Sequence, residues 1–230
     1  MKTHPHNPNL HIIHGSNWQS RKLLPQENGF IEDYLESIEA VMNTALEHHP
    51  RTLMIRCDLH FPRDQLDGYR FAISRFLASL KAQIEHDQRS KYLAGQRVHD
   101  CQLRYIWAKE QATSELPHYH IALFLNRDSY FNLGQFQQIG YAPFPDTPMP
   151  YFVEQAPNMA CRIVRAWASA LRIHESCAIG LVHFPENPTY YLRSDDPVVF
   201  AEAFERLSYL AKADTKLYRD GTRWFGTSRS

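Results

Sequence analysis

Two histidines, His118 and His120, stand one residue apart at the start of the apolar segment ELPHYHIALFLN, residues 115–126. In a β-strand, residues i and i+2 point to the same face, so both imidazoles would lie on one face of a sheet. Imidazole nitrogens are common ligands of divalent metal ions. The spacing alone is a weak indication, because a chain with 13 histidines among 230 residues should contain on the order of one such pair by chance. The neighbouring segments must supply the rest of a site.

A carboxylate is expected beside these histidines. The segment DCQLRYIWAKE, which ends at Glu110, is rich in aromatic and branched residues and leads into the histidine segment as the first half of a β-hairpin. If the turn lies near Ser114, Glu110 stands opposite His118 and projects to the same side, with roughly 5 Å between the Cβ atoms. Two imidazoles and a carboxylate suit Mn²⁺ or Mg²⁺. Asp58 or His60, from an earlier strand, could take the place of the third ligand.

A tyrosine near the end of the chain is the candidate nucleophile. In the helix expected after Pro197, Tyr209 lies off the apolar face, and Lys212 follows one turn later. A tyrosine hydroxyl is almost entirely protonated at neutral pH, so a tyrosine nucleophile needs a cation or a metal-polarised target nearby. Lys212 would supply that cation.

The C-terminal segment KLYRDGTRWFGTSRS is the most basic part of the chain, with Asp220 as its single acid. Such a segment could contact a phosphate backbone. The candidate DNA-binding residues are Lys216, Arg219, Arg223 and Arg229.

The periodicity that positions these residues predicts an α+β fold, with a central antiparallel sheet of about five strands and helices packed on it. Residues 1–28 are expected to form a loose N-terminal segment, and residues 29–230 a single domain with a Pro-rich loop at 140–157. Helices are predicted at 29–50, 64–84, 158–173 and 197–216, and strands at 51–62, 100–110, 117–126, 178–184 and 189–193.

Composition limits the classes of function. Lysine plus arginine equals aspartate plus glutamate at 25 each, so any site for a polyanion must be a local patch. The four cysteines show no C-x-x-C spacing and are expected to be free thiols in a reducing cytosol. No apolar run approaches 18 residues, so we expect a cytoplasmic protein with neither a signal peptide nor a membrane span.

Four segments together resemble the HUH endonuclease superfamily of rolling-circle replication initiators. More narrowly, they are similar to the inovirus type of replication protein, grouped with the YagK/YfjJ C-terminal domain family of prophages. The segments that carry the resemblance span roughly residues 30 to 230 and read LMIRCDLHFP, WAKEQATSELPHYHIALFLNRD, ERLSYLAKADTK and WFGTSR.

The resemblance implies an RRM/ferredoxin-like HUH fold, in which His118, His120 and Glu110 hold the metal ion. Tyr209 would attack a phosphate of single-stranded or hairpin DNA at a replication origin, keep a 5′-phosphotyrosine and release a 3′-hydroxyl, with Lys212 activating the phenol. The chain lacks the G-x-x-x-x-G-K-[ST] motif of P-loop helicases, so it would depend on a host helicase and polymerase.

Two other hypotheses make different predictions. A catalytically inactive prophage DNA-binding regulator with the same fold would bind DNA independently of His118. A structural-metal or small-molecule protein would use the histidines for tight zinc binding and would place Tyr209 far from them.

Overall fold

A computed structural model of the chain describes residues 2–63, 71–111, 116–134, 139–142, 149–152, 158–214, 216 and 222–229. Its α-helices are α1 (Glu32–His48), α2 (Ala72–Leu93), α3 (Met159–Leu171), α4 (Glu175–Ala178) and α5 (Pro197–Ser208), with 3-10 turns η2 (Ile179–Leu181) and η3 (Tyr209–Ala211). The strands of the main sheet are β6 (Arg51–His60), β7 (Arg104–Glu110), β8 (His118–Asn126), β11 (Val182–His183), β12 (Thr189–Arg193) and β13 (Phe225–Thr227).

The main sheet is antiparallel throughout its described pairings, which confirms the α+β class. Its order is β11-β6-β8-β7-β13. β12 pairs with the same edge of β6 as β11 does, but with residues 51–55 at the other end of the strand. The sheet thus has six described strands, where about five were expected. β8 lies at the centre and is paired along its whole length with β6, from Thr52 opposite Asn126 to His60 opposite His118. A strand held on both sides is a rigid base for side chains that must keep a fixed geometry.

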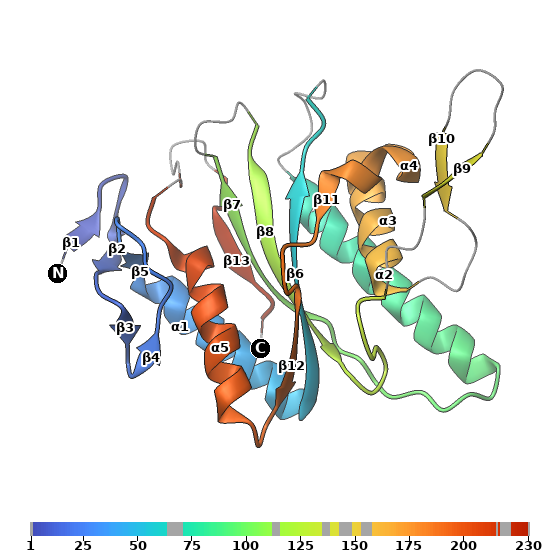
Figure 1. Cartoon of the computed structure of the whole chain (residues 1–230), viewed down its shortest axis with the longest axis horizontal. Coiled ribbons are helices and arrows are strands. Elements are labelled where there is room, and N and C mark those ends of the chain that lie inside the picture. The colour runs from blue at the N-terminus through green and yellow to red at the C-terminus, as the bar shows by residue number, and fades with distance from the viewer. Residues whose placement is uncertain are drawn as a thin grey trace.

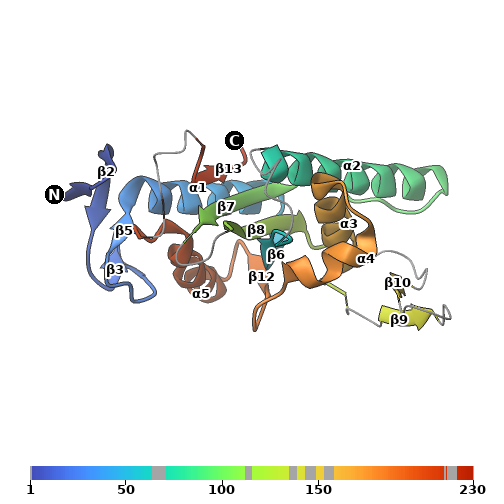
Figure 2. The same ribbon diagram turned by 90° about the horizontal axis from the view of Figure 1, so that it is seen from above.

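Helices cover both faces of this sheet. α1 and α5 pack on one face, against residues such as Met54, Ala122 and Phe124, whereas α2 and α3 pack on the other, against residues such as Ile55 and Ile121 (Figure 1). Viewed from above, the sheet runs between these two pairs of helices (Figure 2). Successive strand residues alternate between the two faces, and the face of β6 and β8 that meets α2 and α3 is apolar along its whole length. On the face toward α1 and α5, the apolar residues give way to polar ones at the end of the strands that carries Asp58, His118 and His120.

The prediction that residues 1–28 form a loose segment is wrong. Strands β1 (Lys2–His4) and β2 (Asn7–Ile13) pair with each other, and β2 also pairs with β5 (Phe30–Ile31), while β3 (Asn17–Trp18) pairs with β4 (Arg21–Lys22). Leu10, Trp18 and Leu23 from this segment are buried. The segment therefore packs on the rest of the molecule through these apolar side chains. Its Pro- and Asn-rich sequence has no periodicity that would predict this packing.

The other boundaries differ in detail. The predicted helix 158–173 is confirmed as α3, whose N-cap Asn158 accepts a hydrogen bond from the amide of Cys161 at 2.9 Å. The predicted Pro-rich loop contains a pair of short antiparallel strands, β9 (Ile139–Ala142) and β10 (Met149–Phe152), and its remaining positions lie outside the described residues. The second predicted helix begins at Ala72 and runs on to Leu93, and the last one ends at Ser208.

The cysteines are all free: Cys57 and Cys101 are buried, Cys161 is half-buried and Cys177 is exposed. Within the described residues, no helix combines the length and the apolar character needed to cross a membrane.

Candidate metal centre

The β7–β8 hairpin has the register that the sequence predicted. Glu110 stands opposite His118, and Ala108 stands opposite His120. Ala108 and Glu110 share this face of the sheet, and the Glu110 carboxylate lies between His120 and Lys212. One ligand atom from each of Glu110, His118 and His120 lies within 4.8 Å of the others.

The three ligand atoms converge on one point. His118 Nε2 lies 3.1 Å from His120 Nε2, and His120 Nε2 lies 3.2 Å from Glu110 Oε2. Glu110 is buried, and its second oxygen, Oε1, has no hydrogen-bond partner within the described part of the chain. A buried carboxylate oxygen without a partner is costly unless a cation fills the place. The residues present therefore fit a divalent ion bound by two nitrogens and one or two oxygens.

Asp58 or His60 was the predicted alternative for the third metal ligand, but neither side chain belongs to the cluster of ligand atoms. Asp58 Oδ1 lies 2.6 Å from Nδ1 of His120, on the side of the ring away from the ligand atoms. Arg56 Nη2 is 3.2 Å from the same oxygen. His60 stacks on His118, with ring centroids 5.4 Å apart, and lies outside the cluster. Asp58 is thus an orienting partner for His120.

The electrostatics keep the carboxylates ionised. Burial would raise the pKa of Asp58, but the hydrogen bond to His120 and the charge of Arg56 outweigh it and lower this pKa to about 2. For Glu110, burial is likewise outweighed by His120 and by Lys212, and its pKa falls to about 2. Burial and the neighbouring His120 lower the pKa of His118 to about 4, so this ring is neutral at pH 7 and its nitrogen lone pair is available to a metal ion.

Tyr209 lies directly beside this cluster. Its ring meets the ring of His120 edge to face, with centroids 5.3 Å apart. Lys212 Nζ joins the two groups, because it donates to the hydroxyl of Tyr209 at 2.6 Å and lies 2.7 Å from Glu110 Oε2. Burial would lower the pKa of Lys212, but its contacts with Glu110 and Tyr209 raise it, so the amine is a cation at neutral pH. The hypothesis that places Tyr209 far from the histidines is contradicted.

The local backbone explains how Tyr209 and Lys212 reach the sheet. α5 tightens into the 3-10 turn η3, and Lys212 then leaves it in an extended conformation and forms an isolated bridge with Phe30. Ala213 donates its amide to the carbonyl of Gly29 at 3.0 Å, and His4 Nε2 lies 2.9 Å from the carbonyl oxygen of Ala213. The N-terminal part of the chain therefore contacts the residues that directly follow the candidate nucleophile.

The described residues among the predicted DNA-binding set of the C-terminal segment do not lie on one common surface. Lys216 is buried and donates to the carbonyl of Lys212 at 2.5 Å, so its ammonium group does not lie on a DNA-binding surface; burial lowers its pKa to about 8. Arg219 lies outside the described residues. Arg223 is exposed on the opposite face of the sheet from the histidines. Arg229, also exposed, accepts a hydrogen bond from Arg104 at the other end of β7, about 20 Å from Glu110.

Fold and site together define an α+β protein with a candidate divalent-metal centre beside a tyrosine–lysine pair. The chain belongs to the YagK/YfjJ C-terminal domain family, whose family model matches residues 13–228. It is 33% identical over 211 residues to the uncharacterized protein YagK of Escherichia coli (strain K12), covering 86% of this chain and 93% of the relative. The uncharacterized protein YfjJ of the same strain is 31% identical over 213 residues, covering 85% and 93%. No solved structure matches this chain.

Proposed function

We propose that this protein is a metal-dependent, tyrosine-type single-stranded DNA nickase of the HUH endonuclease superfamily, which initiates rolling-circle replication of a phage or prophage-like element. The observation that carries the proposal is the continuous chain of contacts from Tyr209 through Lys212 to Glu110 and the two histidines. A nucleophile, a cation and a metal-ligand set converge from segments about 100 residues apart in the sequence. Packing alone does not require that combination of residue types.

Each group has a role in the proposed reaction. His118, His120 and Glu110 would hold Mn²⁺ or Mg²⁺, and a bound ion of this kind supplies Lewis-acid polarisation of a phosphate. Tyr209 attacks phosphorus and forms an O–P bond while the P–O3′ bond breaks. The phenol proton is lost to water, and the departing oxygen takes up a proton to become a 3′-hydroxyl. Lys212, at 2.6 Å from the Tyr209 hydroxyl, stabilises negative charge that develops on this oxygen.

The proposal extends to partners. The DNA would be single-stranded or hairpin DNA at a replication origin, because the tyrosine must reach a phosphate that is not held inside a duplex. A host helicase would open the duplex, and a host polymerase would extend the released 3′-hydroxyl.

A covalent adduct tests the proposal. Wild-type protein is incubated with Mn²⁺ and a panel of labelled single-stranded and hairpin DNAs from phage origins, and SDS-resistant protein–DNA adducts are counted on gels. Wild type should form an adduct, whereas Tyr209→Phe and His118→Ala should lose it. Tyr190→Phe is the matched control, since Tyr190 is also half-buried and packs on the same face of the sheet.

The results separate the hypotheses. An adduct that persists in Tyr209→Phe assigns the nucleophile to another residue and overturns the mechanism. DNA binding without an adduct at any origin sequence, unchanged in His118→Ala, supports the inactive DNA-binding regulator in its place.

A further inference from the structure

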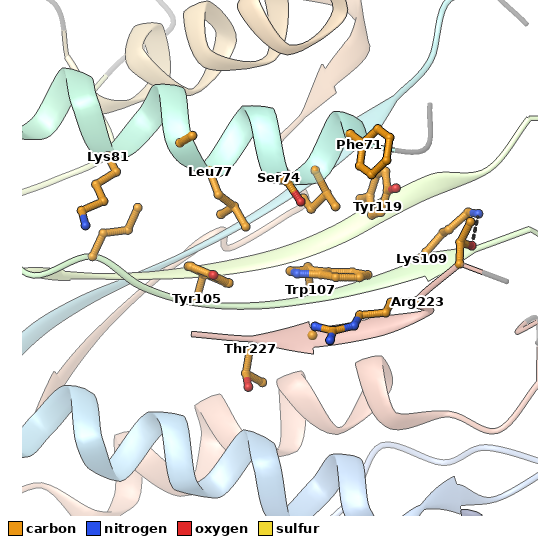
Figure 3. Close-up of a pocket in the computed structure, with 15 residues that line it drawn as sticks. Phe71, Ser74, Leu77, Lys81, Tyr105, Trp107, Lys109, Tyr119, Arg223 and Thr227 are labelled. Carbon is orange, nitrogen blue, oxygen red and sulfur yellow. Dashed lines mark hydrogen bonds between the residues drawn. The ribbon is translucent and has the colours of Figure 1, made fainter. Parts of the chain in front are cut away.

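A groove of about 610 Å³ lies on the face of the sheet opposite the metal centre, between α2, β7 and β13 (Figure 3). Figure 3 shows the side chains of α2 directed toward β7, with Arg223 on the other side of the groove. We call it the Trp107 groove; its lining includes Phe71, Leu77, Lys81, Tyr105, Trp107 and Arg223.

The groove exists because β7 has two faces with different neighbours. Glu110 and Ala108 face the metal centre, whereas Tyr105, Trp107 and Lys109 alternate with them and form the floor of the groove. β13 closes the floor at Gly226, where an added Cβ would lie 2.6 Å from the Trp107 ring. Glycine at this position therefore permits the close approach of β13 to a large aromatic ring.

The lining combines rings with positive charge. Phe71 is 61% exposed, and Tyr105 is half-buried on the floor. The three charged side chains among the described lining residues, Lys81, Lys109 and Arg223, are all cations. Lys81 and Arg223 are exposed, whereas Lys109 is buried and donates to Thr222. In a chain of zero net charge, the two exposed cations supply local positive charge for a polyanion. Aromatic faces and cations along one groove are the features that bind single-stranded nucleic acid, through base stacking and phosphate contacts.

We propose that the Trp107 groove binds the single-stranded DNA that flanks the cleaved bond. This inference rests on the proposed function and adds a second DNA site to it. Lys109 and Glu110 are adjacent residues at one end of β7, so a strand leaving the metal centre passes around this end to enter the groove. From Lys109 to Leu103 the floor runs roughly 20 Å, which leaves room for several nucleotides.

The test measures binding without catalysis. Fluorescence anisotropy of a fluorescein-labelled oligothymidylate of about 12 nucleotides is followed in EDTA, at several salt concentrations. Phe71→Ala should weaken binding about tenfold, as expected for one lost stacking contact, and Phe71→Tyr should keep wild-type affinity. Lys81→Ala and Arg223→Ala should each make the slope of log K against log salt shallower by about 0.7.

The chain offers a matched control for the charge effect. Lys22 is 71% exposed and pairs with Glu205, just as Lys81 is 70% exposed and pairs with Glu85. Lys22→Ala should leave affinity and salt slope unchanged. Circular dichroism of each variant verifies that it is folded.

Wild-type affinity in the folded groove variants, or equal losses in Lys22→Ala, overturns the inference. Competition by thymidine monophosphate at the same concentration as the oligonucleotide also overturns it, in favour of a site for single nucleotides. If Tyr209 forms an adduct but the groove variants have no effect, the groove proposal is rejected and the nickase proposal stands. If binding depends on the groove residues but no adduct forms under any condition, the nickase proposal is rejected and the groove still binds single-stranded DNA.

Discussion

Asp58 Oδ1 lies 2.6 Å from His120 Nδ1 and so fixes the orientation of a ring whose other nitrogen faces His118 and Glu110. A carboxylate on the outer nitrogen of a metal-binding histidine holds the ring orientation and raises its basicity. We therefore predict that Asp58→Asn weakens Mn²⁺ binding 10- to 100-fold in isothermal titration calorimetry.

A control for the Asp58 variant comes from another paired carboxylate. Asp87 forms an ion pair with Arg162 at 2.7 Å on the other side of the sheet, and Asp87→Asn should cost stability without changing Mn²⁺ affinity. Equal Mn²⁺ affinity in Asp58→Asn and wild type would show that Asp58 does not act on the metal site.

The metal centre should also be visible in thermal unfolding. A ligand at 100 times its dissociation constant stabilises the folded state by about 2.7 kcal/mol, which raises Tm by roughly 5–10 °C in a chain of this size. We predict such a shift for wild type with Mn²⁺ in differential scanning fluorimetry, and none for His118→Ala relative to its own metal-free Tm. His60→Ala, which removes a ring stacked on His118 but outside the cluster, should keep the shift. A shift retained by His118→Ala would place the ion elsewhere.

The sequence was most informative about the hairpin that carries the ligands. The two-residue period of β7 and β8 predicted the pairing of Glu110 with His118, because this register follows from local pattern and turn position. The contact of Tyr209 with His120 followed only from the family resemblance, since spacing along the chain does not determine which helix crosses which strand.

Other features depend on tertiary contacts that have no local signal. Strands β1 and β2 lack the alternation of a half-buried strand, and β2 pairs with residues 30–31, which the pattern assigned to a helix. Lys216 was predicted to contact DNA because it begins the most basic segment of the chain. Its burial depends on the turn after α5 and the carbonyl of Lys212.

The burial of Lys216 has a consequence for stability. Its pKa is lowered from 10.5 to about 8, so between these values the unfolded chain binds more protons than the folded one. The contribution of this residue to the free energy of unfolding therefore increases as pH rises from 8 to 10.5, by roughly 3 kcal/mol in total. Below pH 8, the buried ammonium group costs about this amount.

We accordingly predict that Lys216→Met increases the free energy of unfolding at pH 7 by about 1–3 kcal/mol, after subtraction of the lost hydrogen bond to Lys212. Urea denaturation in EDTA at pH 7 and pH 10 measures the effect, which should shrink at the higher pH. Lys81→Met, at an exposed position, should change neither value. Destabilisation of Lys216→Met at pH 7 would mean that the ammonium group stabilises the fold despite its burial.

The N-terminal segment should control the segment that carries Tyr209. His4 is buried and contacts the carbonyl of Ala213, the residue that follows Lys212, whereas His6 is exposed two positions later in the same segment. Loss of a buried hydrogen bond costs about 1–3 kcal/mol locally, so His4→Ala should accelerate amide hydrogen exchange in residues 208–214 about tenfold. His6→Ala should not, and exchange in β8 should be unchanged in both variants because that strand is paired on both sides. If mass spectrometry shows the same exchange at 208–214 in the two variants, the nucleophile segment is held by α5 and the sheet alone, and the first strands of the chain have no part in positioning it.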